Sequence, residues 1–119
     1  MDQHEHEEQA ALFQWASYSK AKYPELRWMF AVPNGGYRPV QVAKKLRAEG
    51  VKAGVPDIFL PVPIGGYHGL WIEMKYGTNK PTSEQEDWLE YLGKAGYMAV
   101  VCYGWDKAKD VVLEYLQEA

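Results

Sequence analysis

Two short segments of the sequence carry charged residues whose types and spacing suit metal-ion chemistry. Asp57 follows a proline in the first segment, and Glu73 and Lys75 stand two apart in the second. Both segments are otherwise apolar, which predicts short central strands over 56–60 and 70–75. Alternate residues of a strand point to opposite faces of the sheet, so Glu73 and Lys75 share a face. If the strands are neighbours, Asp57 joins them, and two carboxylates and an ammonium group lie together.

Two interpretations of this group are open. The ordinary one is a Glu–Lys ion pair on a solvated face, with Asp57 as a residue of a turn or of a strand start. Against it, charges in a central strand cost folding free energy unless a metal ion or a substrate compensates for them. Carboxylate oxygens suit Mg²⁺ or Mn²⁺, and a neighbouring lysine can activate water and stabilise charge on a phosphate. The alternative interpretation is therefore a metal site for phosphate chemistry.

Length and composition limit what the chain can be. With 119 residues, a single domain over 1–119 is expected, and 47% apolar residues suffice for a core. The one cysteine, Cys102, excludes an internal disulfide and fits a reducing compartment. No apolar stretch approaches the ~20 residues of a membrane span, and no signal peptide is visible. We therefore expect a cytoplasmic protein without a membrane partner.

The first segment, 2–22, is predicted to be a helix capped by its first residue. Glu8 precedes Leu12 by four residues, which places it on or near the apolar stripe of this helix. An acid in that position usually has a partner, although a solvated position stays open. Glu5 and Glu7 are interpreted as solvated first-turn acids that compensate the helix dipole.

A strand over 26–32 is predicted from its apolar run. It ends in a turn that contains Asn34 and Gly35, residue types that accept positive φ. Plain chain reversal is the simpler interpretation of this turn. The functional one is that glycine lets the backbone approach a nucleic-acid phosphate.

A helix predicted over 39–49 lies in the most basic part of the chain. Between residues 38 and 52 the only acid is Glu49, and the basic residues are Arg38, Lys44, Lys45, Arg47 and Lys52. A run of like charges is ordinarily a solvated face. Beside a metal site, the same charges could also bind the phosphates of a nucleic acid. The net charge of −3 counts against a nucleic-acid binder, although acids and bases are segregated along the chain.

The rest of the chain alternates helix and strand. Thr82 or Ser83 caps a helix on which Gln85 is directed toward the sheet. An apolar run over 97–103 predicts a buried strand, and Asp106 is placed to cap a final helix. The order α-β-α-β-β-α-β-α predicts an α/β domain with a mixed sheet of about four strands flanked by helices.

Five of these features occur together and in order in one known family. They are Glu8 in the first helix, Pro33-Asn-Gly-Gly36, Gly50-x-x-x-Gly54-Val-Pro-Asp57, Gly69-Leu-Trp-Ile-Glu-Met-Lys75 and Gln85. Jointly they resemble the stand-alone VRR-NUC domains of phages and bacteria, a branch of the PD-(D/E)XK nucleases. The resemblance covers nearly the whole chain and implies the restriction-endonuclease-like fold of that superfamily.

The resemblance also implies a set of site residues. The residues that match the family's catalytic positions are Glu8, Asp57, Glu73 and Lys75. Asp57 and Glu73 would bind the metal through carboxylates, and Met74 would bind it through its main-chain carbonyl. Lys75 would be the catalytic lysine. Glu8 would complete the site directly or through water, with Glu7 as the alternative first-helix acid.

The resemblance also implies an accessory residue, whereas the turn and the basic segment predict the nucleic-acid contacts. Gln85 resembles a glutamine that borders such sites. The residues expected to contact nucleic acid are Asn34, Gly35, Arg38, Lys44, Lys45 and Lys52. These residues would supply the track along which each subunit holds DNA.

The implied activity is hydrolysis of DNA phosphodiester bonds with Mg²⁺ or Mn²⁺ as cofactor. Small stand-alone members resemble Holliday junction resolvases and tend to be symmetric dimers, whereas a larger eukaryotic repair nuclease carries an insertion that prevents this dimer. No comparable insertion fits between these motifs, so we expect a homodimer. Its expected substrate is branched DNA in repair or recombination. The resemblance further implies a protein encoded by a phage or a bacterial host. Flap cutting, duplex nicking and a catalytically silent binding module stay as alternatives.

Overall fold

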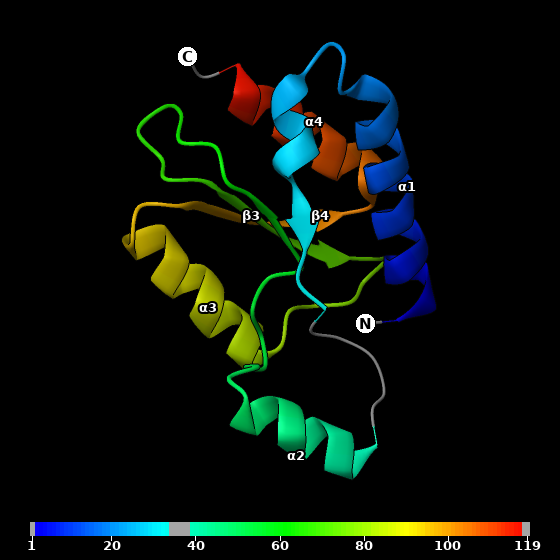
Figure 1. The fold of residues 1–119 in the computed structure, drawn as a ribbon, viewed down its shortest axis with the longest axis vertical. Coiled ribbons are helices and arrows are strands. Elements are labelled where there is room, and N and C mark those ends of the chain that lie inside the picture. The colour runs from blue at the N-terminus through cyan, green and yellow to red at the C-terminus, as the bar shows by residue number, and fades with distance from the viewer. Residues whose placement is uncertain (1, 34–38, 118–119) are drawn as a thin grey trace.

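The computed structural model describes residues 2–33 and 39–117 (Figure 1). In chain order the elements are α1 (Gln3–Ser19), the 3₁₀-helix η1 (Pro24–Trp28), β1 (Phe30–Ala31), α2 (Val40–Ala48), β2 (Ile58–Leu60), β3 (Leu70–Lys75), α3 (Ser83–Lys94), β4 (Met98–Tyr103) and α4 (Trp105–Leu116). Apart from η1 this is the predicted order, and it confirms the α/β class. The predicted contact residues Asn34, Gly35 and Arg38 lie outside the described residues.

The strands form one mixed sheet in the order β1-β2-β3-β4. The pairs β1–β2 and β2–β3 are antiparallel, and β3–β4 is parallel. The strands expected to be central, β2 and β3, are the two inner ones, as predicted. Leu70, Ile72 and Met74 are fully buried on the face that packs against α1 and α4, while α3 packs beside β4 on the opposite face. The charged residues of β3 lie on the α3 face.

The predicted strand over 26–32 is wrong for most of its length, because η1 takes its first part and only the two residues of β1 pair with β2. Pro24 supplies the fixed φ of a helix start. Leu26 and Met29 are buried, and their spacing of three residues is that of a 3₁₀ turn. An apolar run without alternation does not distinguish these conformations, so packing of η1 against α1 decided between them.

Two helix starts are capped as predicted. Oδ1 of Asp2 accepts the N–H of Glu5 at 2.7 Å, which satisfies a first-turn donor of α1. Thr82 caps α3 in a reciprocal arrangement with Gln85, in which each side chain accepts the N–H of the other residue. Both helices therefore begin at positions set by the local sequence.

The predicted cap of α4 by Asp106 is wrong. The helix begins at Trp105, whose N–H donates to Oε1 of Glu8 at 2.9 Å. Gly104, which precedes it, has a φ of 94°, and a Cβ there would lie 3.1 Å from the same carboxylate oxygen. A side chain of α1 thus satisfies the first turn of α4, and the glycine leaves room for that contact.

The basic helix α2 has the predicted position in the chain but stands apart from the rest of the molecule (Figure 1). None of its residues is buried, and it makes no extensive contact with another described element. Within residues 2–33 and 39–117, no helix is both long and apolar enough to cross a membrane.

Candidate active site

Asp57 lies directly before β2, at the end of the sheet where β1 ends. The β2–β3 register, continued by one residue, places Asp57 opposite Glu73. Oδ2 of Asp57 accepts the N–H of Met74 at 2.7 Å, and its main-chain carbonyl accepts the N–H of Val32 at 2.7 Å. The backbone of β3 therefore holds the carboxylate of Asp57, and the residue that follows β1 holds its main chain.

Glu73 and Lys75 complete a buried charged cluster with Asp57. The exposed fractions of Asp57, Glu73 and Lys75 are only 5%, 1% and 7%. Oε2 of Glu73 accepts a hydrogen bond from Nε2 of Gln85 at 2.9 Å and lies 3.8 Å from Nζ of Lys75. Oε1 of Glu73 is buried without a hydrogen-bond partner among the described residues. The three side chains meet as the strand positions predicted, while their roles stay predictions.

The two carboxyl groups of the cluster resist carrying two negative charges. Burial raises the pKa of Glu73 to about 9, with Asp57 adding to the increase and the ammonium of Lys75 opposing it. Burial also raises the pKa of Asp57, although the hydrogen bond from the N–H of Met74 partly opposes this rise. One lysine therefore does not compensate for two buried carboxylates, and a bound cation would.

The main-chain carbonyl of Met74 points to the same edge of β3 as the carboxylate of Asp57. In a strand, the N–H and C=O of one residue face the same neighbour, and the N–H of Met74 contacts Asp57. The continued register places Pro56 opposite Met74, and proline has no N–H to donate to that carbonyl. The position suits the predicted ligand, and ligation itself stays a prediction.

Glu5 of α1 faces this cluster, whereas the part of Glu8 in the site stays a prediction. Glu5 exposes only 3% of its surface, and its charge contributes to the raised pKa of both Asp57 and Glu73. Glu8 instead accepts the N–H of Trp105 at the start of α4. The prediction that Glu5 lies in a solvated first turn is wrong, because the loop after β3 covers that turn.

Asn79, in the loop after β3, is a residue that the sequence patterns did not single out. Its Nδ2 donates to Oε2 of Glu5 at 2.9 Å and to Oδ2 of Asp2 at 2.5 Å, and its carbonyl accepts the hydroxyl of Tyr103 at 2.8 Å. Asn79 thereby fixes the loop against α1 and orients Glu5. No local signal could reveal this contact, since Asn79 and Asp2 are 77 residues apart in sequence.

Residues 3–106, most of the chain, match the model of the VRR-NUC domain family. This chain belongs to the VRR-NUC family. A solved structure described as a VRR_NUC domain protein is similar to it with a TM-score of 0.83 and 34% sequence identity, over 97% of this chain and 89% of that one. A search of curated proteins finds no match. The VRR-NUC assignment confirms the recognised family and identifies a nuclease-type domain, for which DNA is the substrate class.

The donor atoms of this VRR-NUC site fit a hard divalent cation. Asp57 and Glu73 offer carboxylate oxygens, one of them the buried, unpartnered Oε1 of Glu73, and Met74 offers its carbonyl. Among the described residues, no three His, Cys, Asp or Glu side chains gather closely enough to hold a metal alone. Mg²⁺ typically binds one or two carboxylates and keeps several waters, so this set suits Mg²⁺ or Mn²⁺ better than zinc.

The capping box of α3 orients Gln85 at the VRR-NUC site. Its Oε1 accepts the N–H of Thr82 at 2.8 Å, which leaves Nε2 as the donor to Glu73. The prediction that Gln85 is directed toward the sheet is therefore confirmed. Its accessory part in catalysis stays a prediction.

Three of the residues predicted to contact nucleic acid are described by the structure, and all three are exposed. Lys44 and Lys45 lie on α2, and Lys52 lies in the segment that leads to β2. Their ammonium groups are solvated, as both interpretations of the charge run require. Contact with DNA stays a prediction for all three.

Proposed function

We propose that this VRR-NUC domain is a divalent-metal-dependent, structure-selective DNA endonuclease. The observation that carries the proposal is the buried cluster of Asp57, Glu73 and Lys75, in which one lysine cannot compensate for two ionised carboxylates, so that burial and Asp57 raise the pKa of Glu73 to about 9. Such a cluster lowers folding stability unless a cation completes it. A strongly raised carboxyl pKa such as that of Glu73, in a nuclease-type domain, is typical of a catalytic site.

The residues of the cluster have distinct parts in this proposal. Asp57, Glu73 and the carbonyl of Met74 would hold Mg²⁺ or Mn²⁺, which when bound polarises a phosphate oxygen and lowers the pKa of water. The ammonium of Lys75 orients the attacking water and stabilises the charge that develops on the phosphate. Gln85 keeps the carboxylate of Glu73 in position through its amide. The backbone N–H of Met74 does the same for Asp57.

The assembly that we propose is a symmetric dimer that resolves four-way junctions. Trp28 and Phe30 are both exposed beside or on β1, the edge strand of the sheet, with Trp28 exposing 60% of its surface. Large apolar rings on a sheet edge suit an interface between two copies. Two active sites related by a twofold axis would match the pseudo-twofold symmetry of a junction, one site for each cut.

Cleavage of labelled junction, flap and duplex DNA with Mg²⁺, Mn²⁺ or EDTA tests the chemistry. We expect metal-dependent cutting that Lys75→Ala lowers by about 10²–10⁴-fold, because a positioned catalytic group is lost. Lys94→Ala is the matched control, since Lys94 pairs with Glu90 in an exposed position and should be dispensable. A cooperative melting transition above the assay temperature would show that each variant folds.

The same assay separates the proposal from its alternatives. Cutting in EDTA, or undiminished cutting by Lys75→Ala, contradicts the metal-nuclease assignment. Faster cutting of flaps or nicking of duplex would replace junction resolution as the specificity. Binding of DNA without cutting under any metal would indicate a silent binding module.

A further inference from the structure

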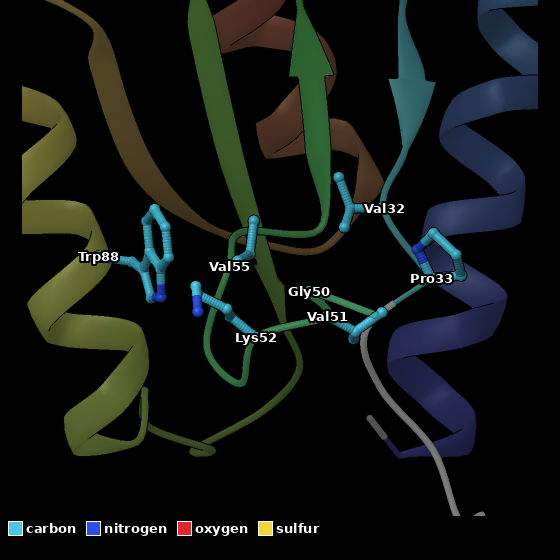
Figure 2. Close-up of a pocket in the computed structure, with 7 residues that line it drawn as sticks. All are labelled: Val32, Pro33, Gly50, Val51, Lys52, Val55 and Trp88. Carbon is cyan, nitrogen blue, oxygen red and sulfur yellow. The ribbon is translucent and has the colours of Figure 1, made fainter. Parts of the chain in front are cut away.

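A cleft between α3 and the segments that flank α2 has the lining of a site for an apolar ring (Figure 2). Its volume is about 340 Å³, and its walls include Val32, Val51, Lys52, Val55 and Trp88. Figure 2 shows Trp88 on one side of the cleft and Val32 on the other, with Val55 between them. Because Lys52 is the charged member of an otherwise apolar lining, the cleft suits an apolar ring attached to an anionic group.

Both walls of the cleft are connected to the proposed catalytic residues. Val32 donates its N–H to the main-chain carbonyl of Asp57 at 2.7 Å. On the opposite wall, Trp88 follows Gln85 by three residues and so lies on the same face of α3. Gln85 in turn donates to Glu73. The cleft therefore borders the same two segments that position Asp57 and Glu73.

The indole of Trp88 is anchored at one edge. Its Nε1 donates to the carbonyl of Ala53 at 3.1 Å. The next residue, Gly54, approaches α3 so closely that a Cβ there would lie 2.6 Å from the backbone of Glu84. The segment before β2 and the helix thus hold the ring in one orientation, and a half-buried ring with its polar atom satisfied presents an apolar face for stacking.

We propose that the cleft takes one unpaired DNA base next to the scissile phosphate, stacked on Trp88, with an adjoining phosphate near Lys52. This inference rests on the proposed nuclease function and deepens it. A base in continuous duplex would have to leave its stack and its pair to enter, whereas a base at a branch point is already free. The cleft would therefore select branched DNA without reading sequence, since every base has a face that stacks.

Cleavage of junctions that carry a single abasic nucleotide tests the cleft. The cut position is mapped first, and the abasic nucleotide is then placed at each position around it. We expect wild-type kcat/KM to fall on the order of tenfold at one flanking position, because the stacked base is missing there. Val51→Trp, which fills the mouth of the cleft, should cut intact and abasic substrates at the same rate. Val42→Trp on α2 is the matched control, since Val42 and Val51 expose 43% and 40% of their surfaces.

A fluorescence measurement distinguishes failure of the cleft from failure of the nuclease function. Junction DNA carries 2-aminopurine at one position near the branch, and each position is tried in turn. The Lys75→Ala variant binds this DNA in EDTA. Stacking on Trp88 should quench the 2-aminopurine fluorescence at one of the positions. The double variant Lys75→Ala/Trp88→Leu should show no such quenching, and its melting curve checks that it folds. Quenching without cutting by the wild type would keep the cleft and refute the nuclease. Two results would overturn the proposal that the cleft binds a base. One is cutting that does not depend on the position of the abasic nucleotide, together with no quenching at any position. The other is an abasic effect in Val51→Trp that equals that of the wild type.

Discussion

The two acids of α1 that face inward have different partners. Glu5 is buried beside Asp57 and Glu73 and is oriented by Asn79, whereas Glu8 caps α4. We expect Glu5→Ala to weaken Mn²⁺ binding on the order of ten- to a hundredfold. Glu8→Ala should leave the affinity for Mn²⁺ near that of wild type and lower the free energy of unfolding by about 0.5–2 kcal/mol, the usual cost of a lost cap.

Calorimetric titration with Mn²⁺ and urea unfolding of both variants check this division. Each variant is the control of the other, because both remove a carboxylate from the same helix. A loss of Mn²⁺ affinity in Glu8→Ala with full affinity in Glu5→Ala would return the first-helix role to Glu8.

Glu73 gives the metal-free protein a specific pH dependence. Its pKa is raised from 4.5 to about 9 by burial and by Asp57, so the folded state keeps a proton that the unfolded state releases. Stability contributed by this group is therefore present at low pH and is lost as pH rises from about 4.5 to 9. Glu73→Gln should remove that loss and stabilise the metal-free protein at pH 8 by about 1–4 kcal/mol.

Melting in EDTA between pH 5 and pH 9 measures the effect of Glu73→Gln. The difference from wild type should widen as pH rises. Mg²⁺ should raise the melting temperature of the wild type and leave that of the variant unchanged. Parallel pH curves for the two proteins would show that Glu73 is not the source of the instability.

At the scale of elements, α2 is a basic helix that contributes nothing to the core. Reversing the charges of Lys44 and Lys45 to Glu should therefore leave the melting temperature and metal binding unchanged. Junction DNA should bind more weakly and with a shallower salt dependence, because fewer counterions are released from the phosphates. Reversal of Lys20 and Lys22, which are exposed at the far end of α1, is the control. Equal loss of affinity in both double variants would argue for net charge rather than a track on α2.

At the scale of the whole molecule, the proposed dimer follows from the exposed rings at the β1 edge. Light scattering should give twice the monomer mass of 13.6 kDa at micromolar concentration. Trp28→Glu should shift the mass to that of the monomer, since a charge replaces an apolar ring at the proposed interface. Tyr18→Glu, at a more exposed ring on α1, should leave the dimer intact. A monomeric wild type that still makes paired cuts in a junction would contradict the symmetric arrangement.

Local sequence patterns determined most of the elements and the centre of the site. Alternating apolar residues predicted β3 and the common face of Glu73 and Lys75, and capping residues predicted the starts of α1 and α3. These features depend on residues a few positions apart, where strand and helix periods act directly. The apolar segment around Asp57 also indicated a central strand, which the sheet order confirms.

Tertiary contacts decided the features that the local patterns left open or assigned wrongly. Glu8 and Trp105 are 97 residues apart, and Asn79 and Glu5 are 74 apart, so no local period connects either pair. Burial of Glu5 depends on the loop that folds over α1, and η1 replaced a predicted strand because it packs against that helix. Helix position alone cannot tell a solvated acid from one that another segment covers. The identity of the inward-facing acids is therefore a property of the packed molecule, because burial and pairing energies arise only between segments that folding brings together.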